Sequence, residues 1–257
     1  MRTERLVQRA WPLPLAWLVL QLLLLGLGLM SLTWNGVALV LYPLLPRPLG
    51  LRVGRAGIAW GYRLFWAVAR ASGLLHMDAD ALRALADERG LVIVANHPSL
   101  LDALMLVAQL PRSACVMKAS LMRNPFLGPG ARLARYIRND SPRQMVHLAI
   151  DDLRGGGQLV MFPEGTRTTR APLNSFQAGF ALIARRAHVP VQTVFIDTTS
   201  PYLGKGWPLW RLPPLPIEFS VRLGRRFEPG ANVAAAVQEI ERYMATGVRP
   251  LPRDPDS

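Results

Sequence analysis

The sequence predicts one α/β domain with a largely parallel or mixed sheet flanked by helices, preceded by an N-terminal membrane-embedded helical hairpin. Short apolar runs at residues 91–95 and 158–162 have the length and composition of buried strands, and helical patterns alternate with such runs along the chain. The 36 residues from Trp11 to Pro46 contain no charged side chain, which is typical of a segment in lipid. We therefore expect a membrane anchor at residues 1–50, the α/β domain at residues 51–248 and a disordered tail at residues 249–257.

The uncharged stretch is long for one membrane span, which takes about 20 residues, and short for two, which take about 40. Residues 31–36, Ser-Leu-Thr-Trp-Asn-Gly, offer a turn near its middle. Positive flanks favour the cytoplasmic side. Arginines flank both ends of the stretch: Arg2, Arg5 and Arg9 before it and Arg47, Arg52 and Arg55 after it. We expect a hairpin that turns at residues 31–36 and enters and leaves by the same face of the membrane.

Residues 56–72 mix aromatic and aliphatic side chains with arginines. Such a mixture suits a helix lying at the headgroup level of a membrane, and packing of the same aromatics against the domain explains it equally well. After this segment we expect a strand at residues 74–77 and a short helix at residues 80–88, which lead to the strand at residues 91–95.

That strand ends in Asn96, His97, Pro98 and Ser99, with Asp102 three residues further on. Pro98 disfavours helix at His97, so the imidazole is expected on the turn after the strand. On a continuous helix, two residues five apart would diverge by about 140°, but from a bent turn Asp102 can reach back to one ring nitrogen. This pairing would fix the tautomer of a general base. Ser99 and Asp102 also match a helix capping box, an alternative that the spacing leaves open.

The strand at residues 158–162 ends in a second polar cluster, Pro163-Glu164-Gly165-Thr166-Arg167. Because the carboxyl ends of parallel strands meet at one edge of a sheet, this cluster and the histidine turn are expected to line one crevice. The chain has no G-x-S-x-G turn, so a covalent serine enzyme of that type is not predicted.

The remaining elements continue the alternation. We expect helices at residues 103–110, 145–153, 176–187 and 231–244, and strands at residues 114–117, 189–196 and 217–223. Cys115 is the single cysteine and has no His or Cys partner at metal-ligand spacing. It is expected to be a core residue, and no metal site is predicted.

The formal net charge of +13 calls for an anionic partner, either nucleic acid or an acidic membrane surface. A nucleic-acid binder does not explain the uncharged N-terminal stretch. The sequence therefore favours a membrane lipid partner and no nucleic acid.

Two motifs together resemble the glycerolipid acyltransferases, whose best-known members are the 1-acyl-glycerol-3-phosphate acyltransferases. These motifs are Asn96-His97-(four residues)-Asp102 and the intact Phe-Pro-Glu-Gly-Thr-Arg at residues 162–167, and the resemblance covers roughly residues 75–225. Two lesser motifs depart from the family pattern. Tyr136-Ile137-Arg138 lacks the usual leading glycine, and residues 192–193 are Gln-Thr where an apolar residue and proline are usual.

Carried over to the matching positions, the resemblance implies a catalytic pair, His97 and Asp102. It implies that Arg167 and Arg138 hold an acceptor phosphate, since a guanidinium matches phosphate oxygens in bidentate fashion. Glu164 would orient Arg167 or bond an acceptor hydroxyl. The expected substrate-binding set is Asn96, Arg138, Glu164, Gly165, Thr166 and Arg167.

The implied activity is membrane-associated O-acyl transfer to the free hydroxyl of a lysophospholipid, with 1-acyl-glycerol-3-phosphate as the default acceptor. The donor would be acyl-CoA or an acyl-carrier-protein thioester, with no further cofactor. The expected location is the cytoplasmic face of a bacterial inner membrane. Two alternatives stay open: a lyso-aminolipid or glycolipid acceptor, and a non-catalytic lipid-binding relative, although such a relative would be expected to lose His97 or Asp102.

Overall fold

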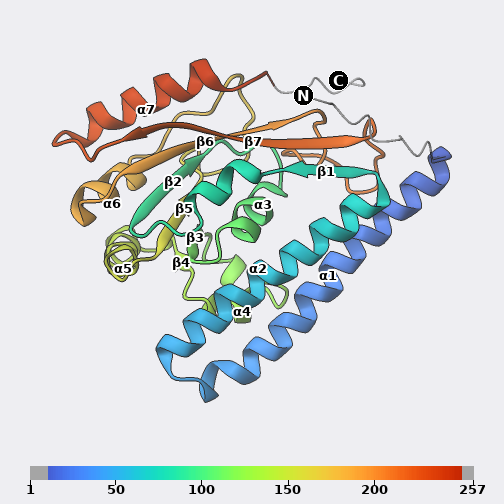
Figure 1. The fold of residues 1–257 in the computed structure, drawn as a ribbon, viewed down its shortest axis with the longest axis horizontal. Coiled ribbons are helices and arrows are strands. Elements are labelled where there is room, and N and C mark those ends of the chain that lie inside the picture. The colour runs from blue at the N-terminus through green and yellow to red at the C-terminus, as the bar shows by residue number, and fades with distance from the viewer. Residues whose placement is uncertain (1–10, 251–257) are drawn as a thin grey trace.

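A computed structural model describes residues 11–250 and shows a mixed sheet with helices on both faces, as the sequence predicts (Figure 1). The seven strands lie in the order β1-β7-β6-β2-β5-β3-β4, and all neighbours run parallel except β6 and β7. The strands are β1 (Leu75–Asp78), β2 (Leu91–Ala95), β3 (Ser113–Met117), β4 (Ile137–Arg138), β5 (Gln158–Met161), β6 (Val191–Thr198) and β7 (Ile217–Phe227).

Helices and short 3-10 turns connect these strands. The helices are α1 (Leu13–Leu44), α2 (Arg47–Ser72), α3 (Asp102–Gln109), α4 (Gly128–Leu133), α5 (Pro142–Arg154), α6 (Gly179–Ala187) and α7 (Val233–Gly247). The 3-10 helices are η1 (Asp80–Leu85) and η2 (Leu121–Arg123). The two-residue strand β4 and the helix α4 have no counterpart among the elements expected from the sequence, because each is too short to show a hydrophobic period.

The central strand β2 is buried on both faces, which explains why its sequence is apolar throughout. Side chains alternate between faces along a strand. Leu91, Ile93 and Ala95 accordingly pack with residues of α1, α2 and α3, whereas Val92 and Val94 pack with residues of α5, α6 and α7. The strand therefore lies at the centre of the domain, and its carboxyl end has a fixed position.

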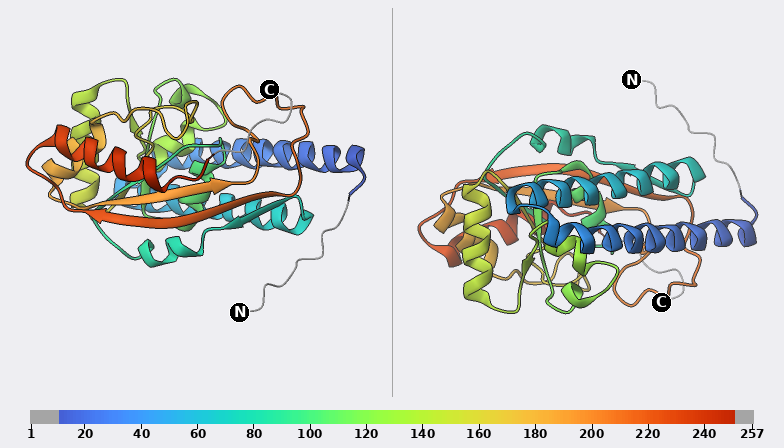
Figure 2. Two further views of the ribbon diagram at one scale, coloured as in Figure 1. Left: turned by 90° about the horizontal axis from the view of Figure 1, so that it is seen from above. Right: turned by 90° about the horizontal axis from the view of Figure 1, so that it is seen from below.

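The N-terminal hairpin differs from the sequence-based expectation. The expected turn at residues 31–36 is wrong, because α1 continues unbroken for 32 residues from Leu13 to Leu44. The chain reverses at Leu45 and Pro46, and α2 then runs back beside α1 (Figures 1 and 2). The hairpin therefore consists of α1 and α2, and the expected boundary at residue 50 falls inside α2.

Polar residues in the middle of α1 explain the error. The Asn35 side chain is buried, donates to the Phe126 carbonyl at 2.6 Å and accepts from the Gly130 amide at 2.7 Å. Ser31 Oγ also donates to the Phe126 carbonyl. These side chains dock the helix on the loop before α4 and on α4 itself, so residues that resemble a turn in the sequence are tertiary contacts inside a helix.

Residues 56–72 belong to α2, and packing against the domain accounts for two of their aromatics, while a position at the headgroup level stays a prediction for the others. Phe65 and Trp66 are buried against the domain, whereas Trp60 is 63% exposed. Within residues 11–250, α1 is the one helix that is long and apolar enough to cross a membrane. The arginines at residues 2–9 and the tail beyond residue 250 lie outside the described residues.

Candidate active site

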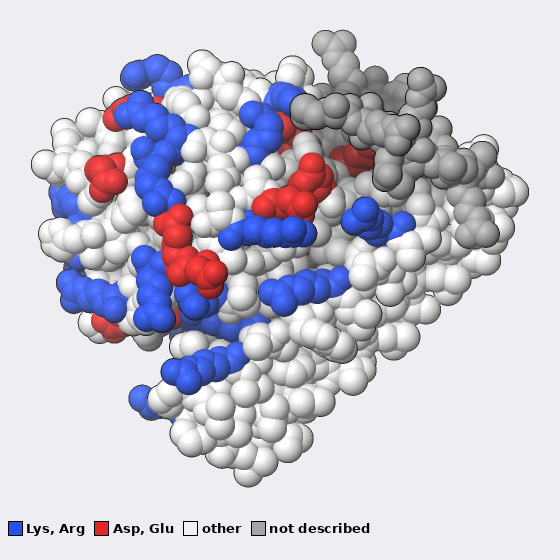
Figure 3. All heavy atoms as spheres, viewed as in Figure 1, with Lys and Arg blue, Asp and Glu red and all other residues white. Residues whose placement is uncertain are grey.

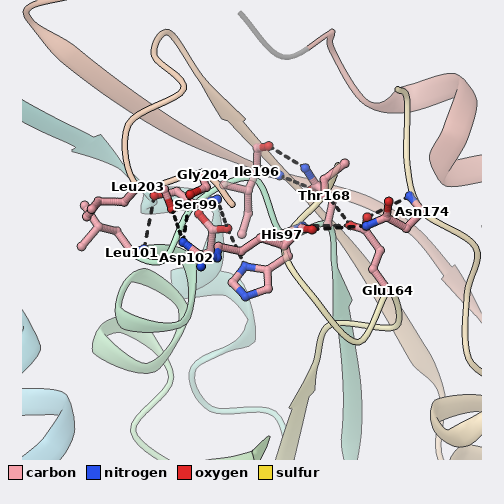
Figure 4. Close-up of polar contacts among 12 residues, drawn as sticks. His97, Ser99, Leu101, Asp102, Glu164, Thr168, Asn174, Ile196, Leu203 and Gly204 are labelled. Atoms are coloured by element: carbon pink, nitrogen blue, oxygen red, sulfur yellow. Dashed lines mark hydrogen bonds and ion pairs between the residues drawn. The ribbon is translucent and has the colours of Figure 1, made fainter. Parts of the chain in front are cut away.

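The polar turn after β2 brings His97 and Asp102 together. His97 Nδ1 lies 2.8 Å from Asp102 Oδ2, and Asp102 is the first residue of α3 (Figure 4). The side chain of His97 is 17% exposed, while that of Asp102 is completely buried. His97 Nε2 makes no hydrogen bond with any residue in the described part of the chain. The pair thus leaves one ring nitrogen available for a proton.

Asp102 also stabilises the turn itself, so one half of the expected capping box forms alongside the pairing with His97, although Leu101 and not Ser99 is the N-cap of α3. Its Oδ2 accepts the Ser99 amide hydrogen at 2.7 Å in addition to the bond from His97. Ser99 Oγ does not complete a reciprocal cap; it accepts from the Leu101 amide and donates to the Tyr202 carbonyl at 3.0 Å. Burial raises the pKa of Asp102, and the bonds from His97 and Ser99 oppose that rise.

Phe162 lies flat against the imidazole of His97. No role for the phenyl ring was expected from the sequence. The two ring centroids are 4.0 Å apart, with an angle of 18° between the planes. Val94 pairs with Met161, so the residues that follow β2 and β5 emerge side by side at the carboxyl edge of the sheet. The stacked ring restricts rotation of the imidazole about its side-chain bonds.

Glu164 connects the histidine turn to the Phe-Pro-Glu-Gly-Thr-Arg loop. Its Oε1 accepts the His97 amide hydrogen at 3.1 Å and the Thr168 hydroxyl at 2.7 Å, and its Oε2 accepts the Asn174 amide hydrogen at 2.9 Å (Figure 4). The Thr168 amide in turn donates to the His97 carbonyl at 2.8 Å. Glu164 is 5% exposed and makes no ion pair with Arg167 in the described residues. The carboxylate therefore orients the backbone at His97 and does not pair with Arg167, while the alternative, a bond to an acceptor hydroxyl, stays a prediction.

Asn96 is likewise engaged inside the protein. Its Nδ2 donates to the Ile196 carbonyl at 2.8 Å, and its Oδ1 accepts the Ile196 amide hydrogen at 2.7 Å. The side-chain amide thus continues the pairing of β2 with β6 beyond the last residue of β2. Both of its polar atoms are engaged and the residue is 1% exposed, so this geometry gives it a structural task at the position where substrate binding was expected.

Gly165 and Thr166 form the tip of the same loop. Gly165 is exposed and has a φ of 70°, a conformation that favours glycine, and a Cβ there would lie 2.4 Å from Gln177 Nε2. Thr166 is half-buried. The tip therefore accommodates no larger residue at position 165 without displacing Gln177.

The two arginines expected to bind phosphate lie in different places. Arg167 belongs to the loop beside His97, and its Nη1 donates to the carbonyls of Leu203 and Gly204, both at 2.9 Å. Arg138 ends β4, which is three strands from β2, or about 14 Å at the usual strand spacing. It pairs with Asp140 at 3.4 Å. The structure therefore places Arg167, and not Arg138, next to the histidine turn.

A family model described as Acyltransferase matches residues 77–197, the segment that contains both polar clusters. Within these residues the chain matches an acyltransferase domain. This assignment agrees with the resemblance of the two sequence motifs. No group of three or more His, Cys, Asp or Glu side chains suited to a metal occurs in the part of the domain that the structure describes.

Curated relatives of the acyltransferase domain include three named 1-acyl-sn-glycerol-3-phosphate acyltransferases. The protein from Limnanthes douglasii is 30% identical over 135 residues, which cover 49% of this chain and 47% of the relative. The human beta enzyme is 26% identical over 67% of this chain and 64% of its own length. That from Pseudomonas aeruginosa is 25% identical over 47% and 49%. The chain spans about half the length of the first curated relatives it matches.

A solved structure shares the fold over nine-tenths of this chain. The 1-acyl-sn-glycerophosphate (LPA) acyltransferase from Thermotoga maritima aligns with a TM-score of 0.64 over 90% of this chain and 93% of that chain, at 20% identity. The fold described above therefore recurs in that protein.

Proposed function

We propose that the protein is a membrane-associated O-acyltransferase that moves a fatty acyl group from an acyl thioester to the free hydroxyl of a lysophospholipid. The observation that carries the proposal is the His97 and Asp102 pair, held at 2.8 Å with Nε2 unengaged, inside an acyltransferase domain. The default acceptor is 1-acyl-glycerol-3-phosphate, in keeping with the names of the relatives. The donor is acyl-CoA or an acyl-carrier-protein thioester, and no other cofactor is needed.

In this reaction His97 Nε2 removes the proton from the acceptor hydroxyl as its oxygen attacks the thioester carbonyl carbon. Asp102 accepts the hydrogen on Nδ1, which keeps Nε2 as the basic nitrogen and stabilises the imidazolium. The tetrahedral intermediate then collapses, the carbon–sulfur bond breaks, and the imidazolium returns its proton to the leaving thiolate. Ser99 is not a nucleophile in this scheme, because its hydroxyl is buried and donates to a backbone carbonyl.

Arg167 is our first candidate for the acceptor phosphate. Its Nη1 is engaged by two loop carbonyls, which fixes the guanidinium, while Nε and Nη2 make no hydrogen bond within residues 11–250. Lys118 directly follows β3, the strand next to β5, and its exposed side chain is a second candidate at the same edge. Arg138 stays a more distant third candidate.

The attachment of α1 supports an anchor that lies in one leaflet and does not cross the bilayer. Near its start, Trp17 Nε1 donates to the Trp210 carbonyl at 2.7 Å and Gln21 to the Leu209 carbonyl at 3.0 Å. Asn35, fourteen residues or about 21 Å further along the helix, binds the loop before α4. A helix held against the domain over this length could span the membrane only if the domain entered the lipid.

The opposite side of α1 is suited to lipid. Its exposed side chains include Leu22, Leu25, Leu29 and Leu39, and the surface over this helix carries no charge (Figure 3). Trp210 is 74% exposed beside the start of the helix and extends the same apolar surface. We place this surface in the cytoplasmic leaflet of a bacterial inner membrane, because acyl thioesters are made in the cytoplasm.

The test is transfer by the purified full-length protein, supplied with a panel of acyl-CoA and acyl-carrier-protein donors and of lyso-lipid acceptors, with products identified by mass spectrometry. We expect acylation of 1-acyl-glycerol-3-phosphate, loss of activity in His97→Ala and full activity in His147→Ala, a control at an imidazole that is 76% exposed. Near-normal turnover by a folded His97→Ala protein, or preference for an acceptor without phosphate, would contradict the proposal.

A further inference from the structure

A cavity lies beside the edge strand β4, bordered by α2, α4 and α5. Its volume is about 1050 Å³, and eight of its lining residues are arginines whereas three are aspartates. None of the residues of the histidine turn or of the Phe-Pro-Glu-Gly-Thr-Arg loop lines it. The cavity is therefore distinct from the site at His97 and has a large excess of positive charge.

Internal acids neutralise only part of this charge. Three of the eight arginines form ion pairs: Arg55, which is 4% exposed, with Asp152 at 2.5 Å, Arg138 with Asp140 at 3.4 Å, and Arg112 with Asp87 at 3.7 Å. Five further lining arginines make no ion pair with any residue from 11 to 250: Arg52, Arg89, Arg123, Arg132 and Arg135. Like charges that surround one cavity repel one another, so their arrangement favours an anionic ligand.

Two of these arginines lie where the cavity meets the helical hairpin. Arg52 is exposed on the first half of α2, and the guanidinium of Arg135 lies 5.8 Å from the ring centroid of Tyr42 near the end of α1. Arg135 adopts a φ of 58°, a conformation that residues other than glycine rarely take. The backbone at this position thus takes an uncommon conformation while its side chain extends toward α1.

The rim of the cavity on this side is apolar. Tyr42 lines the cavity, and its neighbours Leu39, Val40 and Leu44 on α1 are 60%, 60% and 69% exposed. A concave cluster of guanidinium groups beside a lipid-facing apolar surface matches an amphiphile with an anionic head. A nucleotide or a free phosphate would use the arginines and leave the apolar rim unexplained.

We propose that this cavity binds the headgroup of an anionic phospholipid whose acyl chains remain in the bilayer along the end of α1. The proposal rests on the placement of α1 in one leaflet given under Proposed function. The bound lipid acts as an anchor at the β4 edge, separate from the acceptor at His97. The lipid headgroup is then the anionic partner of part of the excess positive charge of the chain.

The experiment measures binding to the full-length His97→Ala protein in uncharged detergent, without any thioester, so that its result does not depend on acyl transfer. The probes are dioctanoyl phosphatidylglycerol, dioctanoyl phosphatidylcholine, inorganic phosphate and coenzyme A. The cavity variants are Arg52→Gln with Arg135→Gln and, as a second pair, Arg123→Gln with Arg132→Gln. A control with the same loss of charge is Arg186→Gln with Arg242→Gln; both residues are exposed on α6 and α7.

We expect at least one cavity pair that keeps its thermal midpoint to bind phosphatidylglycerol about tenfold more weakly, a loss of two charge-assisted contacts, while the control changes less than twofold. Phosphatidylcholine binding should be weak and alike in all proteins. Equal weakening in the control would show general electrostatic attraction and overturn the proposal. Competition by inorganic phosphate at the concentration of the lipid would also overturn the proposal, because the cavity would then be a free-anion site. A loss of coenzyme A binding alone would overturn it as well, because the cavity would then be a donor site.

Discussion

Replacement of Asp102 by asparagine tests whether the carboxylate acts by its charge or only by its shape. Both donors that contact Asp102, His97 Nδ1 and the Ser99 amide, converge on Oδ2. Because the Ser99 amide can only donate, the asparagine oxygen must take the Oδ2 position, where it also accepts the hydrogen on Nδ1. The tautomer of His97 is thereby retained, and the variant removes the charge while its Nδ2 takes the place of Oδ1, which has no hydrogen-bond partner within residues 11–250.

The size of the effect follows from the burial of the pair. Two unit charges about 4 Å apart attract by about 4 kcal/mol at an effective dielectric constant of about 20, a factor of about 10³ in rate. The amide dipole restores part of this energy. We expect Asp102→Asn to lower kcat by about 10²- to 10³-fold while both KM values change less than about threefold.

The assay follows thiol release from an acyl thioester in the presence of 1-acyl-glycerol-3-phosphate. Asp80→Asn is the matched control, because that carboxylate is 71% exposed and pairs with Arg83 at the surface. A kcat within about fivefold of the unmodified protein for folded Asp102→Asn would refute electrostatic stabilisation of the imidazolium by Asp102.

Four further predictions test the surroundings of the pair. In Glu164→Gln, the side-chain NH2 group replaces the oxygen that accepts the Asn174 amide hydrogen, so two donors face each other. An unsatisfied buried donor costs about 1–3 kcal/mol, and the thermal midpoint should therefore fall by roughly 2–12 °C. An unchanged midpoint contradicts the connecting role of Glu164. Arg167→Ala should raise the acceptor KM about 10- to 150-fold, with partial rescue by lysine and little change for the thioester; an unchanged KM makes the arginine structural. Phe162→Leu should lower kcat about 2- to 10-fold through the lost stacking, whereas Phe162→Tyr should retain activity. Burial raises the pKa of Cys115 to about 12, so at pH 8 only about 10⁻⁴ of the thiol is ionised, and iodoacetamide should react about 10³-fold more slowly than with the unfolded chain.

Local patterns in the sequence predicted the centre of the domain and the contact between His97 and Asp102. The apolar run at residues 91–95 forms the buried strand β2, and Pro98 after His97 predicted the bend from which Asp102 reaches the imidazole. These inferences succeed because strand burial and a turn over six residues depend on neighbours in the sequence.

Contacts between distant segments needed the tertiary structure. The partner of Asn96 is Ile196, 100 residues away, and the partner of the His97 amide is Glu164, 67 residues away. Nothing in either motif indicates that one amide extends a sheet or that one carboxylate supports the other loop. The order of strands decides both contacts, and it also separates Arg138 from His97 by three strands.

The helical hairpin shows most clearly which features the local sequence determines and which need the tertiary structure. The sequence determined that residues 11–46 are uncharged and favoured a hairpin, but Ser31 and Asn35 indicated a turn in the wrong place. Their polar groups are satisfied by Phe126 and Gly130, which are more than 90 residues away. A polar side chain in an apolar helix needs a hydrogen-bond partner once it is buried, and only the packing of α1 on the domain determines whether that partner is nearby in the chain or far along it.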